Sequence, residues 1–248
     1  MDLPGQPALT TPSAPASRDL PTPGRALAIG AHPDDIEFGC AGTLAKWAAA
    51  GCVVNHLVLT DGSKGTWDVN ADQKALIERR KDEQREAARR VGAKGEVVFL
   101  GQVDGELETT LALRGEVAFW IRALQPDVVL GHDPWRRYRL HPDHRHAGFL
   151  TVDGIVAARD PFFFHDHEFP HHRPDVLLLF EADEPDHVED VTPFVDAKLA
   201  ALEAHASQFE STMGELPEFR ERIRNRLAEH GARIDVAAGE AFKRIAPL

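Results

Sequence analysis

Short apolar runs alternate with longer amphipathic segments along most of the chain, and this alternation limits the fold more than any other feature. The apolar runs predict buried strands, and the segments between them carry apolar residues at helical spacing. The predicted strands are residues 26–31, 53–60, 96–100, 127–130 and 175–182. The predicted helices are residues 42–50, 73–91, 111–124, about 142–158, 193–207 and 217–230. Strands that alternate with helices favour an α/β fold with a twisted, mostly parallel sheet and helices on both faces.

The first 24 residues differ from the rest of the chain in composition. They are rich in Pro, Ala, Ser and Thr and lack the basic start and apolar core of a signal peptide, so we expect a disordered tail. Residues 25–248 are expected to form a single domain, because a chain of 248 residues with 43% hydrophobic content can bury one core. No run approaches the roughly 18 apolar residues of a membrane span, and we expect a cytoplasmic protein.

Charge and cysteine content argue against several classes of function. The formal net charge is −12 and the pI is about 5.5, so nucleic acid is not an expected partner, although a local basic pocket is compatible with these values. The two cysteines are Cys40 and Cys52. They are too few for a disulfide scaffold or a cysteine-based zinc knuckle, and we expect two buried free thiols.

Two clusters of histidine and aspartate follow two of the predicted strands. The first, His32-Pro-Asp-Asp35, comes directly after the strand at 26–31, and the second, His141-Pro-Asp-His144, lies downstream of the strand at 127–130. Because α/β enzymes keep their chemistry at the carboxyl ends of parallel strands, we expect the clusters to form one metal site. The predicted ligands are His32, Asp35 and His144. They suit zinc or another divalent ion such as Fe²⁺ and leave positions for water and substrate.

The other side chains of the two clusters suit the remaining steps of a hydrolysis. A bound ion lowers the pKa of its water, and Asp34, a carboxylate that is not a ligand, is the candidate base. His141 is the candidate that stabilises the oxyanion and protonates the departing amine, while Asp143 would orient or charge an imidazole. Two alternatives stay open. Each cluster alone fits a helix N-cap, and His141 rather than His144 fits the third ligand position.

Beyond this chemistry, the sequence closely resembles the LmbE-like deacetylases, also called the PIG-L family after N-acetylglucosaminyl-phosphatidylinositol de-N-acetylase. The resemblance extends from Arg25 to about Phe209. The chain departs from the family pattern at Ser63, where Glu is usual, and at Arg139, where some members have Tyr. The matching segments are His32-Pro-Asp-Asp-Ile-Glu-Phe-Gly39, Gly42-Thr-Leu44, Thr60-Asp-Gly62-Ser-Lys-Gly65, Arg80-Lys-Asp-Glu83, Asp104-Gly-Glu-Leu107, His141-Pro-Asp-His144, Lys198 and His205-Ala-Ser-Gln208.

The resemblance carries expectations for fold, activity and site. It implies a Rossmann-like fold and hydrolysis of acetamido or related amide groups, mostly on sugars of the N-acetylglucosamine type. It also implies zinc on the residues that match His32, Asp35 and His144. The same resemblance implies Asp34 as general base and His141 as electrostatic stabiliser or acid, in agreement with the residue chemistry.

Four further side chains are candidates for substrate binding. The resemblance singles out Arg80 from a helix whose other charges are typical of solvated ion pairs, and it places Asp104 in a substrate-side loop. Trp67 lies on a loop at a strand end, where an aromatic wall for a sugar is expected, and Tyr138 adjoins the position at which some members have Tyr. The histidines of the loop at 161–172 lack regular metal-ligand spacing and are left out of the site.

Three classes of function fit the sequence. The leading one is a zinc-dependent N-deacetylase, a hydrolase whose partner is a small N-acylated sugar or glycoconjugate; a homo-oligomer stays open. The second is an amidase of the same chemistry that cleaves a larger amide, such as a thiol S-conjugate. The third is a non-catalytic Rossmann-like protein that binds a metal or a dinucleotide. The segment Gly30-Ala-His-Pro-Asp34 argues against the dinucleotide, because it lacks the G-x-G-x-x-G turn.

Overall fold

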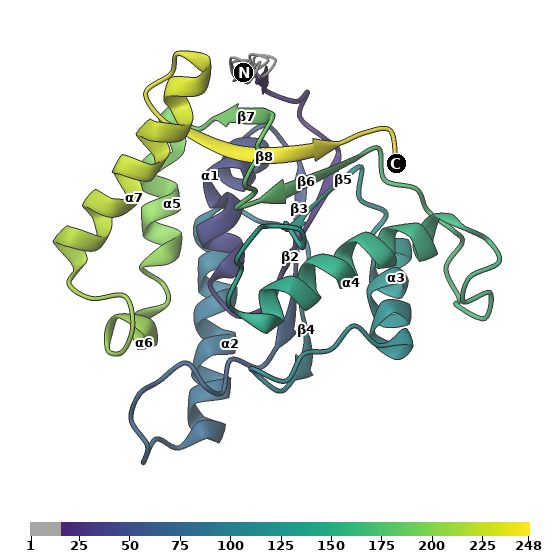
Figure 1. The fold of residues 1–248 in the computed structure, drawn as a ribbon, viewed down its shortest axis with the longest axis horizontal. Helices are drawn as coiled ribbons and strands as arrows, with labels where there is room; N and C mark the ends of the chain where they lie inside the picture. Colours follow the sequence, from purple (N-terminus) through teal and green to yellow (C-terminus); the bar gives the residue numbers. More distant parts are fainter. Residues whose placement is uncertain (1–15) are drawn as a thin grey trace, which may run out of the picture.

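The computed structural model describes residues 16–248, which form one open sheet flanked by helices (Figure 1). The strands are β1 (Ser17–Arg18), β2 (Arg25–Gly30), β3 (Val53–Thr60), β4 (Val97–Gln102), β5 (Val128–His132), β6 (Val176–Phe180), β7 (His187–Asp190) and β8 (Gly239–Ile245). The α-helices are α1 (Asp35–Ala49), α2 (Gln73–Arg90), α3 (Leu111–Leu124), α4 (Pro142–Arg159), α5 (Val195–Leu202), α6 (Ala206–Phe209) and α7 (Leu216–Gly231). Two short 3₁₀ helices are η1 (Thr192–Phe194) and η2 (Ala232–Ile234).

The sheet is mostly parallel, as the sequence predicts. Its strand order is β1-β7-β8-β6-β5-β2-β3-β4 among the described residues. The strands from β6 to β4 pair in parallel, whereas β8 is antiparallel to both of its neighbours. Parallel neighbours need crossover helices, and the helical segments between the strands supply them.

Helices cover both faces of the sheet because successive side chains of each buried strand point to opposite sides. In β2, Ala26 and Ala28 face the core formed with α1, α2 and α5, while Leu27 and Ile29 face the core formed with α3 and α4. A third apolar cluster packs α7 against α5 through Leu199, Phe219 and other side chains. Figure 1 shows α7 and α5 together at one side of the molecule and α3 with α4 at the other.

The helix predicted at 42–50 was too short, because α1 begins at Asp35. The glycines of its first turns weaken a helical prediction, since glycine has low helix propensity. The structure explains why one of these positions, Gly39, is a glycine. A Cβ at Gly39 would lie 2.6 Å from the ring of Phe180, so only glycine lets α1 approach β6 this closely.

The prediction also missed β7 and β8 and joined two helices in the C-terminal part. The sequence of β7 is His-Val-Glu-Asp, and its polar residues hide the strand pattern although Glu189 is fully buried. In β8 the buried Glu240 has the same effect. The helix predicted at 193–207 is divided into η1, α5 and α6, and the break brings His205 to Glu37.

The N-terminal segment contains structure that the prediction of a tail over residues 1–24 did not include. Residues 1–15 lie outside the described part of the chain, but Ser17 and Arg18 pair in parallel with β7. The expectation for cysteine is confirmed, since Cys40 and Cys52 are buried free thiols. Within residues 16–248, none of the helices has the length and apolarity required to cross a bilayer.

Candidate active site

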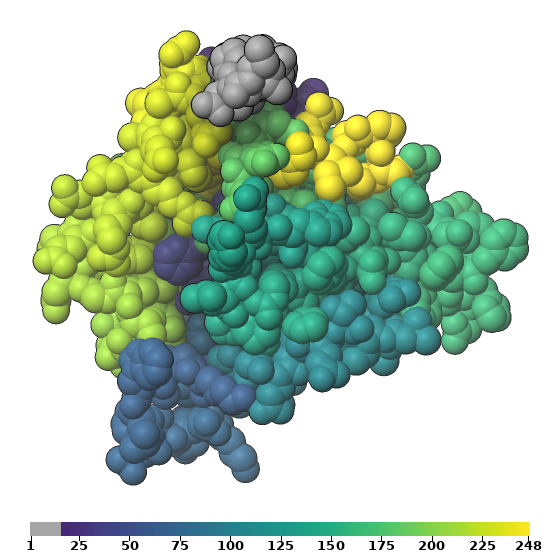
Figure 2. All heavy atoms as spheres, viewed as in Figure 1, coloured from purple at the N-terminus to yellow at the C-terminus, as the bar shows by residue number. Residues whose placement is uncertain are grey.

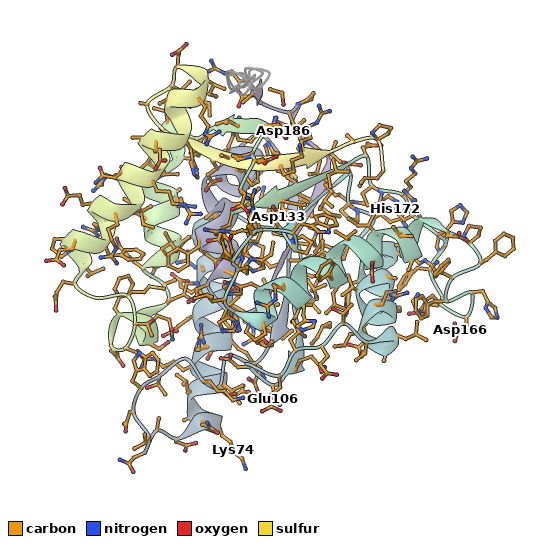
Figure 3. All side chains as sticks on the ribbon, viewed as in Figure 1. Lys74, Glu106, Asp133, Asp166, His172 and Asp186 are labelled. Atoms are coloured by element: carbon orange, nitrogen blue, oxygen red, sulfur yellow. The ribbon has the colours of Figure 1, made fainter. Side chains whose placement is uncertain are left out.

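The two histidine–aspartate clusters meet at the carboxyl edge of the sheet, between β2 and β5. His32 and Asp35 follow β2, and His144 lies in the first turn of α4, the helix after β5. The helices α1 and α4 lie on opposite faces of the sheet. Open α/β sheets place their sites where the connections diverge in this way. Asp133, directly after β5, marks this edge near the middle of the molecule in Figure 3.

His32, Asp35 and His144 bring two imidazole nitrogens and both oxygens of one carboxylate close together. His32 Nδ1 lies 3.2 Å from Asp35 Oδ2 and 3.3 Å from His144 Nε2, and His144 Nε2 lies 3.2 Å from Asp35 Oδ1. Zinc bonds of about 2.0–2.1 Å in a tetrahedral arrangement separate two ligand atoms by roughly 3.3 Å. The donor set therefore fits one small divalent ion.

The second ring nitrogen of His32 faces two carboxylates. His32 Nε2 lies 3.0 Å from Asp143 Oδ2 and 3.3 Å from Asp104 Oδ1. Burial opposes a positive charge on His32, but hydrogen bonds to these carboxylates raise its pKa well above the usual range. A proton kept on Nε2 leaves the lone pair of Nδ1 free for an ion, which is how carboxylates orient metal-binding histidines.

Asp143 is fully buried and does not face the opening of the site. Its carboxylate accepts hydrogen bonds from the backbone N–H groups of Gly105 and Leu107, at 2.7 and 3.3 Å. The structure thus places Asp143 against His32 and the loop at 104–107. The imidazole that it orients is His32.

Asp34 has a left-handed backbone conformation, with φ of 103°. Its carboxylate lies 3.3 Å from the guanidinium of Arg80, which also donates to the carbonyl oxygens of Pro33 and Gly62. Burial raises the pKa of Asp34 to about 6, although Arg80 opposes the rise. A carboxylate with a raised pKa is a stronger base than an exposed one, as proton abstraction requires.

A buried polar chain lies behind Asp34. The backbone N–H of Asp34 donates to Gln84 Oε1 at 3.0 Å, and Gln84 Nε2 donates to Glu37 Oε1 at 2.8 Å. The other oxygen of Glu37 lies 3.1 Å from His205 Nε2. Burial alone would raise the pKa of Glu37, but the hydrogen bond from His205 helps to hold it below its usual value. A role for Gln84 could not be predicted from the sequence, because its contact with Asp34 joins residues 50 positions apart.

His141 forms the N-cap of α4 at the opening of the site. Its ring centroid lies 4.7 Å from that of His32 and 4.7 Å from that of His144, and it stacks on His144 at an interplanar angle of 19°. Nitrogens of the three rings lie within 4.8 Å of one another. His141 is therefore placed to contact a substrate, and a role as ligand also fits this geometry.

His132 is a fourth histidine of the site and was not among the residues predicted from the sequence. Its ring is 1% exposed and stacks on His144 at 4.4 Å, and its Nε2 lies 3.2 Å from Asp35 Oδ2. Asp35, His132 and His144 form a further group that could hold an ion. The predicted strand stopped at residue 130, whereas β5 continues to His132; the position directly after the apolar run was the available signal.

Arg139, noted as a departure from the family pattern, lies against the outer nitrogen of His144. Its Nη1 is 3.0 Å from His144 Nδ1 and 2.5 Å from Glu181 Oε2. Burial would raise the pKa of Glu181, but Arg139 and other nearby positive groups hold it at about 2. An anionic Glu181 therefore neutralises Arg139 beside the proposed ligand.

The four substrate-binding candidates divide into two groups. Arg80 and Asp104 are buried within the site, and Asp104 also accepts the backbone N–H of Lys64 at 3.1 Å. Trp67 and Tyr138 are 83% and 89% exposed on loops, and Trp67 lines a pocket together with Ser63 and Lys64. The hydrogen bonds of Arg80 are to Asp34 and to the backbone around it. Substrate binding by these four side chains stays a prediction.

The loop at 161–172 lies away from the site. Asp166 and His172 are at the edge of the molecule in Figure 3, far from Asp133. Arg122 holds this loop by donating to the carbonyl oxygens of Phe163 and Phe164. None of its histidines belongs to a potential metal group among the described residues. It is a loop, as predicted, but it does not cover the site.

A histidine–aspartate site at the switch point of a Rossmann-like sheet defines a class of α/β protein suited to metal-assisted hydrolysis. A family model described as GlcNAc-PI de-N-acetylase, PIG-L, matches residues 27–155. The chain belongs to this family, and the predicted resemblance is confirmed.

Curated and solved relatives agree with this family. The chain is 36% identical over 195 residues to a diacetylchitobiose deacetylase of Thermococcus kodakarensis, covering 77% of this chain and 73% of the relative. It is 29% identical to a probable N-acetyl-alpha-D-glucosaminyl L-malate deacetylase 2 of Bacillus anthracis, covering 77% and 84%. The structure of an N,N′-diacetylchitobiose deacetylase from Pyrococcus horikoshii superposes with a TM-score of 0.84 at 30% identity, covering 91% of this chain and 85% of the other.

Replacement of Gln84 by Leu tests whether this side chain positions Asp34. The variant leaves the Asp34 N–H and Glu37 without their partner, and such a loss costs about 1–3 kcal/mol, or roughly 5- to 150-fold in kcat if the base is displaced. We expect kcat to fall in this range with KM and metal content near wild type. Arg85→Ala, on the exposed side of α2, is the control. A raised KM at normal kcat would contradict the assignment.

Proposed function

We propose that the protein is a divalent-metal-dependent N-deacetylase that hydrolyses the acetamido group of an N-acetylated amino sugar or glycoconjugate. The observation that carries the proposal is the convergence of donor atoms from His32, Asp35 and His144 with the base Asp34 beside them. The names of the relatives, which are deacetylases of N-acetylated sugars, support the same substrate class.

The metal in this proposal is zinc, held by His32 Nδ1, a carboxylate oxygen of Asp35 and His144 Nε2. When bound, zinc lowers the pKa of water toward neutrality and polarises a carbonyl group. Asp143 contributes through His32, since its carboxylate keeps the proton on Nε2 and so presents Nδ1 to the ion.

The protein groups then divide the proton transfers of amide hydrolysis. Asp34 takes a proton from the attacking water as the new C–O bond forms. His141 donates a hydrogen bond to the carbonyl oxygen as negative charge develops there. The C–N bond breaks as the nitrogen receives a proton from the imidazolium form of His141, which gives acetic acid and the free amino sugar. The acetic acid returns its proton to His141 and leaves as acetate, and Asp34 releases its proton to solvent. Arg80 and Gln84 hold Asp34 in place throughout.

The metal requirement is tested by elemental analysis and chelation. We expect about one divalent ion per chain near neutral pH, loss of deacetylase activity with chelator, and recovery on return of zinc or a similar ion. The proposed ligands lie outside the apolar clusters that form the core, so the folded state should survive chelation. Full activity in protein shown to be free of metal would overturn the proposal.

Substitution of the two adjacent aspartates separates catalysis from metal binding. Asp34→Asn keeps the shape and removes the base, so we expect turnover to fall by about 10²-fold or more with metal content near wild type. Asp35→Ala removes a ligand and should lose the metal. Activity is measured as acetate release and metal content by elemental analysis. Exchange of the two phenotypes would show that the roles are reversed.

Substitution of the two histidines of the second cluster decides which one is the third ligand. His144→Ala is expected to lose metal. His141→Ala is expected to keep it and to lower kcat more than it raises KM, with a cost of about 2–4 kcal/mol for one oxyanion donor. Metal loss in His141→Ala with retention in His144→Ala would make His141 the ligand.

A further inference from the structure

A pocket of about 360 Å³ adjoins the site on the side of the C-terminal helix α7. Asp34 and Phe38 of the α1 end form one wall, and Phe219, Arg222, Ile223 and Arg226 of α7 form the other. Figure 2 shows a hollow here, between the yellow-green surface of the C-terminal helices and the teal surface, with purple atoms of an early segment at its floor. A volume of this size accommodates a small polar group of a ligand.

The helix α7 presents two arginines to this pocket because of its periodicity. Phe219, Ile223 and Leu227 are buried and hold α7 against the body of the protein. Arg222 and Arg226 are four residues apart, so they lie on one side of the helix, next to this apolar face. Both line the pocket that contains Asp34. The arginines therefore face the space in which a substrate must approach the base.

The pocket holds more positive than negative charge. The guanidinium of Arg222 donates to the carbonyl oxygen of Met213 at 2.8 Å and lies 5.6 Å above the ring of Phe219, and no carboxylate of residues 16–248 forms an ion pair with it. Among residues 16–248, the one ion pair of Arg226 is with Glu181, at 3.5 Å. Glu181 also pairs with Arg139 at 2.5 Å, so one negative charge is shared between Arg139 and Arg226.

Asp34, the acidic residue of the pocket, does not neutralise the two arginines of α7. Asp34 is paired with Arg80 at 3.3 Å, on the opposite wall from α7. The chain as a whole has a net charge of −12 and therefore repels anions in general. A positive pocket in such a chain favours binding of a specific anion at that place. Guanidinium groups bind carboxylate and phosphate through paired hydrogen bonds that a neutral hydroxyl cannot match.

We propose that Arg222 and Arg226 form a subsite for an anionic substituent, a carboxylate or a phosphate, on the N-acetylated sugar. The inference rests on the proposed deacetylase function, because the substituent and the acetamido group belong to one substrate. Since Asp34 borders both the reaction centre and the pocket, a substituent on the same sugar reaches the arginines while the amide lies beside the base.

The experiment compares neutral and anionic sugars with the metal-loaded enzyme. N-acetylglucosamine and N,N′-diacetylchitobiose are the neutral substrates, N-acetylglucosamine 1- and 6-phosphate carry phosphate, and N-acetylmuramic acid carries carboxylate. We expect kcat/KM to be about tenfold or more higher for at least one anionic sugar, mainly through a lower KM. The phosphate and carboxylate arms identify which anion is preferred.

Substitutions on α7 assign the effect to the two arginines. Arg222→Ala and Arg226→Ala should each lower the ratio of kcat/KM for the preferred anionic sugar to that for N-acetylglucosamine, by about tenfold. Arg224→Ala is the matched control, because Arg224 lies on the same helix, is half exposed and pairs with the exposed Asp196. Retention of a high ratio in the double variant Arg222→Ala/Arg226→Ala would overturn the proposal.

A binding measurement tests the anionic subsite without relying on turnover. Calorimetry should show tighter binding of the preferred anionic sugar than of N-acetylglucosamine to wild-type enzyme, and loss of that difference in the double variant. Equal binding of neutral and anionic sugars would refute the anionic subsite while leaving deacetylation intact. Selective anion binding without acetate release from any sugar would instead refute the proposed function.

Discussion

The left-handed backbone at Asp34 is the constraint on which the site depends. With φ at 103°, the chain sends two adjacent carboxylates in different directions, Asp35 toward His32 and His144, and Asp34 toward Arg80. Such a conformation costs about 1–3 kcal/mol in a residue other than glycine and persists only when its surroundings enforce it. Gln84 binds the N–H of Asp34 and Arg80 binds the carbonyl oxygen of Pro33, so α2 supplies both restraints.

Buried charged side chains that pair with one another also hold the first turns of α1 in place. Lys198 of α5 donates to the carbonyl oxygens of Glu37 and Phe38 and to Glu240 of β8, and Glu240 accepts the backbone N–H groups of Gly42 and Thr43. Unpaired, each of these charges would be costly in the interior. Paired, they tie the first turns of α1 to α5, β8 and the His205 turn. The Lys198 and His205 segments that resemble the family therefore support the site from behind.

The sequence predicted the parts of this structure whose signals are local. The strand at 53–60 and the helix at 111–124 have the observed bounds, since continuous apolar or periodic patterns define them. The clusters at His32 and His144 could be joined because parallel strands end at one edge. Long-range effects could not be predicted: the contact of Gln84 with Asp34, the approach of Gly39 to Phe180, and the buried polar residues that hide β7 and β8.

The proposed catalytic residues and the proposed anion subsite lie in different parts of the chain. The proposed ligands, base and stabiliser all lie within residues 27–155, the segment that matches the family model. The arginines of α7 lie beyond it, on a helix that packs against α5 through its own apolar cluster. A helix attached in this way can change its pocket-facing residues without disturbing the paired charges beneath the site.

Among the described residues, the side chain of Glu181 connects the two parts, because it contacts Arg139 beside His144 and also Arg226 of α7. Occupation of the pocket by an anion would compete with Glu181 for Arg226 and leave Glu181 to Arg139, so the two parts are coupled through a shared ion pair.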